Sequence, residues 1–182
     1  FRSGLFSLGQ EGQLMLGGMM AAWLGYAVQL PPVIHPLFAI AAAMLIGGLY
    51  GLIPGILKVK LGVNEIISTI VLNNIANLFV TYLINFPLRA DQSTTAHSHP
   101  ILDSARMLPL APNSKFGIGF FIAILATLVV TLYLWRTSPG YEERMSGQAP
   151  FFARYGGVPH QGAAIRGMFL SGTLGGLAGA IQ

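Results

Sequence analysis

The sequence predicts an all-α fold, a polytopic bundle of membrane-spanning helices. Of its 182 residues, 53% are hydrophobic and only 9% are charged, whereas a soluble domain has about 25% charged residues. Such a composition could not cover the surface of a soluble domain and also excludes intrinsic disorder. The absence of cysteine excludes a disulfide scaffold, a thiolate zinc site and a cysteine nucleophile.

Roughly five apolar runs approach the length of about 20 residues that a helix needs to cross a bilayer. We expect membrane segments at about residues 5–30, 33–57, 64–86, 116–136 and 162–182. The first opens with polar residues, and the second is interrupted by Pro54-Gly55. Because the last run stops inside apolar sequence, we expect residues 1–182 to be a single transmembrane domain fragment of a longer protein.

The basic residues predict which loops lie on the same side of the membrane. Lys and Arg favour the cytoplasmic side, and the turn after the second segment shares a side with the loop at 137–161. We therefore expect 137–161 to be cytoplasmic and 87–115 to be an extracytoplasmic loop. The inner group is Lys58, Lys60, Arg136, Arg144 and Arg154; the outer group is Arg89, Arg106 and Lys115.

The net charge and the glycine content indicate what surrounds these segments: lipid, and closely packed neighbouring helices. The net charge of +4 comes from scattered basic residues. Binding of nucleic acid requires clustered Lys and Arg, so we expect a lipid bilayer and no nucleic acid as the partner. The 23 glycines lie mostly within the apolar runs. Small residues let helix backbones approach closely in lipid, so this pattern favours a packed bundle.

A polar ridge follows one face of the third segment. Residues spaced four apart share a helix face. Asn73 and Asn77 would lie about 14 and about 20 Å from its inner end, near the middle of the bilayer. The ridge either bonds neighbouring helices together or lines a path for a polar, uncharged solute. Its members are Glu65, Thr69, Asn73, Asn77 and Thr81.

A second polar cluster, Gln10-Glu11-Gly12-Gln13, opens the first segment. An ionisable residue within a membrane is a candidate functional residue, and broken helices beside transport paths have this composition. Glu11 and Gln13 are therefore candidates for the substrate path. The alternative is that Glu11 lies at the water interface.

The 136–161 loop contains the sequence of a short helix. Pro150 suits the first position of a helix, and Gly156 suits its end. Such a helix would present Phe151, Phe152 and Tyr155 as anchors for the pocket of a partner. The alternative is a helix whose aromatic side chains lie on the lipid surface.

Catalytic and metal-binding chemistry find little support in the sequence. The chain lacks the Gly-x-x-x-x-Gly-Lys-Ser/Thr pattern of a phosphate-binding loop. His97 and His99 lie in the polar 87–115 loop, where we interpret them as solvated side chains. We predict no catalytic residue, no metal site and no cofactor.

Three motifs together resemble a known family. Gly62-Val63-Asn64-Glu65 through Asn73 resembles the signature of permease subunits of bacterial ABC importers for nucleosides, simple sugars and riboflavin, within the group that contains the branched-chain amino-acid permeases. Residues 6–14 look like the early motif of that family. Residues 140–158 and 170–179 are similar to its cytoplasmic loop and the helix that follows.

This resemblance implies a roughly ten-helix permease in the inner membrane that performs no bond chemistry itself. It implies partners: ABC ATPase subunits, a second permease subunit and an extracytoplasmic substrate-binding lipoprotein. An ATP-independent channel or secondary transporter is the alternative. Phe151 and Phe152 differ from the small or acidic pair usual in the family. The implied ATPase-coupling residues are Pro150, Phe151, Phe152, Ala153, Arg154, Tyr155 and Gly156.

Overall fold

Seven helices form the part of the chain that the computed structural model describes, residues 4–32, 34–88, 102 and 117–182. They are α1 (Gln10–Ala27), α2 (Ile34–Leu61), α3 (Glu65–Asn85), α4 (Gly119–Arg136), α5 (Ser138–Gln148), α6 (Pro150–Tyr155) and α7 (His160–Ile181). Every regular element in these ranges is a helix, so the predicted all-α bundle is confirmed. Most of the predicted 87–115 loop, including His97 and His99, lies outside the described residues.

Four of the helices, α2, α3, α4 and α7, are long and apolar enough to cross a membrane. Helix α1 is not among them, because Gln10, Glu11 and Gln13 occupy its first turns. It begins at Gln10, whereas the apolar run was expected to begin near Leu5. Residues 5–8 are instead non-helical.

The predicted interruption of the second segment at Pro54-Gly55 is wrong, because α2 continues through both residues to Leu61. A proline inside a helix removes one backbone hydrogen bond, and membrane helices tolerate this where neighbouring protein surrounds the site. Pro54 and Gly55 are both buried, and Gly55 lies against Met168 of α7. The packing of α7 therefore covers the proline.

Helices α1, α2 and α7 form the core, and glycine permits their contact. Gly17 of α1 and Gly47 of α2 both face Gly176 of α7: a Cβ added to Gly17 would lie 2.5 Å from the Gly176 Cα, and one added to Gly47 would lie 2.8 Å from it. No side chain fits at these distances. The predicted close packing of glycine-rich helices is present in this three-helix core.

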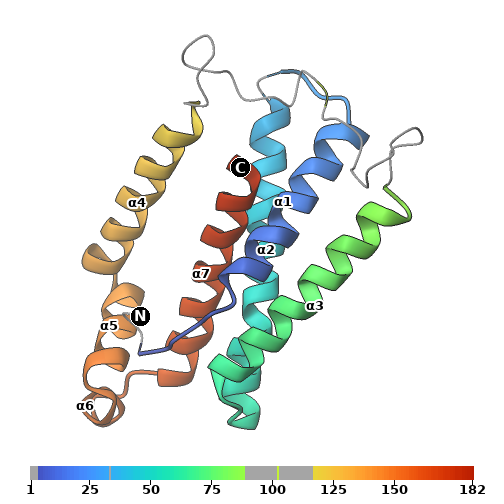
Figure 1. Ribbon diagram of the computed structural model, residues 1–182. Helices are drawn as coiled ribbons and strands as arrows, with labels where there is room; N and C mark the ends of the chain where they lie inside the picture. Colours follow the sequence, from blue (N-terminus) through green and yellow to red (C-terminus); the bar gives the residue numbers. More distant parts are fainter. Residues whose placement is uncertain (1–3, 33, 89–101, 103–116) are drawn as a thin grey trace.

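The two remaining long helices, α3 and α4, differ in how much they contact this core. Helix α3 packs on α1 and α2, and the Tyr50 hydroxyl of α2 donates to the Leu72 carbonyl of α3 at 2.7 Å. Helix α4 packs mainly on α5 and leaves nearly all of its length exposed. The α2–α3 turn lies at the same end of the bundle as α5 and α6 (Figure 1). This arrangement agrees with the predicted grouping of the basic loops.

Replacing Gly176 with alanine tests the core contact. A methyl group there would meet the backbone of Ala43 and Met44, so we expect Gly176→Ala to destabilise the protein by about 1–3 kcal/mol. Thermal unfolding in detergent measures the effect. Gly162→Ala is the matched control on the same helix, because its Cβ would have only one neighbour, 3.9 Å away. Equal melting temperatures for the two variants would contradict the packing assignment.

Candidate functional site

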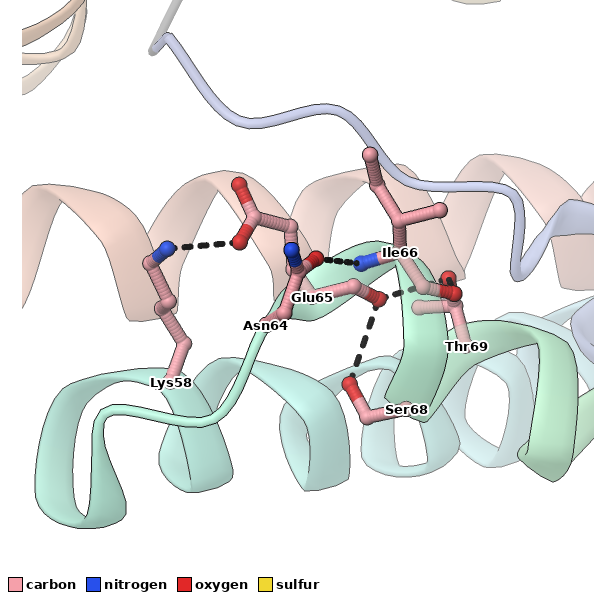
Figure 2. A network of polar contacts seen from close by, with 6 residues as sticks. All are labelled: Lys58, Asn64, Glu65, Ile66, Ser68 and Thr69. Atoms are coloured by element: carbon pink, nitrogen blue, oxygen red, sulfur yellow. Dashed lines mark hydrogen bonds and ion pairs between the residues drawn. The ribbon is translucent and has the colours of Figure 1, made fainter.

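The first turn of α3 is fixed by a local network of polar contacts (Figure 2). The Asn64 side chain caps the helix by accepting from the Ile66 backbone N–H at 2.9 Å. Such a cap satisfies one of the N–H groups that a helix start leaves unpaired. Lys58 Nζ at the end of α2 lies 2.6 Å from the Glu65 carboxylate. Glu65 therefore joins α2 to α3 at this end of the ridge.

Further along α3, Thr69 and Asn73 bond to the chain that enters α1. The Leu8 backbone N–H donates to Thr69 Oγ1 at 3.3 Å, and Asn73 Nδ2 donates to the Leu8 carbonyl at 2.7 Å. Asn73 Oδ1 also accepts from the Gly12 N–H at 3.0 Å. Both amide atoms of Asn73 are thus used, and Thr69 is completely buried.

The half of the ridge nearer the C-terminal end of α3 is more accessible than the half that bonds to Leu8 and Gly12. Asn77 and Thr81 are exposed, and the Thr81 hydroxyl lies 3.4 Å from Asn77 Oδ1. Asn74, beside the ridge, donates to the Ile70 carbonyl of its own helix at 3.0 Å. Asn77 and Thr81 are therefore the ridge side chains that a solute could reach in the described part of the chain.

The polar cluster at the start of α1 also contains both buried and exposed side chains. Gln13 is 1% exposed and lies against Gly175 of α7. Gln10 Nε2 donates to Ser171 Oγ of α7 at 3.0 Å. Glu11 points outward and is exposed. The structure thus places Gln13 inside the core and leaves Glu11 accessible.

The predicted short helix of the 137–161 loop is present as α6, which packs on α5 and α7. Phe151, Phe152 and Tyr155 are 81%, 67% and 93% exposed, whereas Ala153 is buried. Gly156 donates its N–H to the Phe152 carbonyl at 2.9 Å and ends the helix. One face of α6 is therefore fixed to the protein, and three aromatic side chains cover the other.

Helix α5, which carries α6, was not predicted from the sequence. Thr137 caps this helix by accepting from the Gly140 N–H at 3.2 Å. Threonine followed by a proline in the first turn is a helix-start signal, and Thr137-Ser138-Pro139 could have revealed it. The apolar pattern gave no such signal, because α5 is mostly polar.

Three contacts fasten α5 to its neighbours. Glu142 forms an ion pair with Arg166 of α7. The Tyr133 hydroxyl of α4 donates to Glu143 Oε1 at 2.9 Å. The Arg144 guanidinium lies 4.2 Å from the centre of the Trp135 ring of α4, a distance suited to cation–π attraction. These contacts join α5 to α4 and α7 by specific geometry.

Glu143 is buried among these contacts. Burial raises the pKa of its carboxyl above the ordinary value, and Glu142 adds to the rise. The Tyr133 hydrogen bond and the charge of Arg166 act in the opposite direction but do not cancel it. The folded protein therefore holds the Glu143 proton more tightly than the unfolded chain does.

This raised pKa predicts a pH dependence of stability. A group that binds its proton more tightly when folded stabilises the protein below the unfolded pKa, here 4.5, and loses that contribution as pH rises through the folded pKa. We expect Glu143→Gln to flatten the decline in melting temperature from pH 4.5 upward. Glu11→Gln, at an exposed position, is the control. A decline unchanged in Glu143→Gln would show that another group causes it.

Residues 1–182 match the family described as the permease component of the branched-chain amino acid transport system. The chain is 35% identical to the guanosine ABC transporter permease protein of Bacillus subtilis, over 100% of this chain and 53% of that protein. It is 29% identical to the nucleoside ABC transporter permease protein of Lactococcus lactis, over 98% and 51%.

A glucose ABC transporter permease protein of Haloferax volcanii is also 29% identical, over 98% of this chain and 50% of that protein. The chain spans about half the length of these relatives. No solved structure matches it significantly. The match over the whole chain confirms the resemblance of the three sequence motifs, and the chain belongs to the family of branched-chain amino acid transport system permease components.

Proposed function

We propose that this chain is part of the permease subunit of an ATP-driven ABC importer. It would move a neutral polar solute, such as a nucleoside, a simple sugar or riboflavin, across the inner membrane. The observation that carries this proposal is α6, whose exposed Phe151, Phe152 and Tyr155 stand on a helix fixed by α5. A transporter that works without an ATPase has no need of such a docking surface.

Docking on α6 supplies the mechanical step. Partner ATPases bind and hydrolyse ATP, and a groove on each ATPase receives the aromatic side chains of α6. Since α5 is joined to α7 by the Glu142–Arg166 ion pair, movement of α6 reaches the three-helix core. A second permease subunit completes the path, and an extracytoplasmic binding lipoprotein delivers the solute.

The exposed part of the α3 ridge indicates the class of solute. Asn77 and Thr81 offer amide and hydroxyl groups without charge, and such groups suit the hydroxyls and ring nitrogens of neutral solutes. The relatives named for guanosine, nucleosides and glucose are consistent with this class. Exposed polar groups in a bilayer must face protein or water, which supports a position on the path.

Substitutions on α6 test the docking assignment. We expect Phe151→Asp or Phe152→Asp, made in the complete subunit, to lower ATP-dependent uptake of labelled guanosine by about tenfold or more. An aromatic anchor that becomes buried in the groove of the ATPase contributes about 2 kcal/mol or more to binding. Uptake into proteoliposomes, with ATP hydrolysis measured alongside, provides the test.

Tyr141→Asp is the control for this experiment, since Tyr141 is an exposed aromatic residue of α5 outside α6. It should leave uptake unchanged. Normal coupled uptake in both phenylalanine variants would contradict docking through α6. ATP-independent uptake by the unsubstituted protein would favour a channel or a secondary transporter.

A substitution in the ridge tests the solute path. Asn77→Leu removes an exposed amide, and we expect uptake to fall about three- to tenfold, the worth of one hydrogen bond between neutral groups. Competition among guanosine, glucose and riboflavin shows which solute depends on the amide. Thr131→Val is the control on α4, where an exposed hydroxyl bonds to its own helix. Undiminished uptake with Asn77→Leu would remove this residue from the path.

A further inference from the structure

Residues 4–9, here called the N-terminal strap, connect two parts of the molecule that are far apart in the sequence. The strap runs from the vicinity of α5 to the start of α1 (Figure 1). The proposed function uses α6 and the exposed half of the α3 ridge, and assigns no role to this segment.

At its first end the strap touches α5 backbone to backbone. A Cβ added to Gly4 would lie 3.0 Å from the Gly147 Cα and 3.4 Å from its carbonyl oxygen. Gly4 also has a φ of +72°, a conformation that other residues rarely adopt. The contact therefore depends on glycine for two separate reasons.

At its second end the strap is bonded to α3 through both polar groups of one residue. The Leu8 N–H donates to Thr69 and the Leu8 carbonyl accepts from Asn73, at 3.3 and 2.7 Å. Gly9 lies directly over Thr69, where an added Cβ would approach the Thr69 methyl group to 3.2 Å. Two directional bonds and a close contact fix the position of Leu8 along α3.

The helix that receives the strap also carries the exposed ridge. Asn77 follows Asn73 by four residues and therefore lies one turn further on the same face. Among the described elements, α5 packs on α4, α6 and α7, whereas α3 packs on α1 and α2. The strap thus joins α5 to α3 without passing through the core.

We propose that the N-terminal strap transmits displacement of α5 directly to α3, and that Thr69 and Asn73 are the positioning residues that receive it. This inference rests on the proposed function, because an ATPase docked on α6 supplies the displacement. Thr69 is completely buried, so it acts on the path by holding Leu8 and makes no contact with the solute. Movement of α3 relative to α2 then changes the access of Asn77.

Distance measurements between spin labels test this proposal. Residues 1–182 contain no cysteine, so Leu45→Cys on α2 and Leu78→Cys on α3, both at exposed positions, give one defined label pair once any cysteine elsewhere in the complete subunit is replaced. The complete subunit is assembled with its ATPases in lipid nanodiscs. The label distance is then compared with and without bound ATP, and a Tyr141→Cys and Leu45→Cys pair reports on α5.

Two matched pairs of variants separate the strap from general damage. Thr69→Val keeps the shape of the side chain but removes the acceptor for Leu8, whereas Thr69→Ser retains it. Gly4→Ala and Gly62→Ala introduce the same conformational strain, since φ is +72° and +65°. Only the methyl group at Gly4 meets another backbone, because nothing lies within 4 Å of a Cβ on Gly62.

We expect ATP to shift the α3–α2 distance in the unsubstituted complex, in Thr69→Ser and in Gly62→Ala. The shift should be lost in Thr69→Val and Gly4→Ala while the ATPases stay bound and the α5 label still responds. A full shift of the α3–α2 distance in both of those variants would overturn the proposed role of the strap. An α5 response without any α3 shift in the unsubstituted complex would overturn it too. Absence of any ATP response would instead contradict the proposed function.

Discussion

Backbone contact between α2 and α7 at glycine positions determines how every other part of the molecule is placed. Two helices that approach closely at Gly47 and Gly176 allow α1 to pack on both, and Gly17 of α1 also faces Gly176. In lipid, such packing replaces the hydrophobic effect as the force that holds helices together. The core therefore requires very small residues in all three helices, and α3, α5 and the strap are positioned on its surface.

Several polar residues in the described part of the bundle join one element to another, whereas Asn77 and Thr81 stay exposed. Glu65 pairs with Lys58, Thr69 and Asn73 bond to Leu8, and Glu142 pairs with Arg166. An unpaired polar group within hydrocarbon costs several kcal/mol. The exposed Asn77 is thus distinguished from Asn73 by its surroundings, although both belong to one sequence pattern.

The sequence predicted those elements whose signals are local. Long apolar runs located the long helices, and Pro150 located α6, because proline has a definite preference for the first turn of a helix. Helix α5 was not predicted because its composition is polar. Its contacts with Trp135 of α4 and Arg166 of α7 also could not be predicted, since both residues lie outside the 137–161 loop. The division of the α3 ridge could not be predicted either, since it depends on where Leu8 lies in space.

The placement of the charged side chains connects these observations. The Lys58–Glu65 and Glu142–Arg166 pairs join α2 to α3 and α5 to α7 close to the end of the bundle that carries α6 (Figure 1). Charges are least costly near a membrane surface, where water remains in reach. In the proposed mechanism, these two ion pairs would help a displacement of α6 reach α7 and the strap. The apolar remainder of α3 and α4 stays free to pack against lipid or further protein.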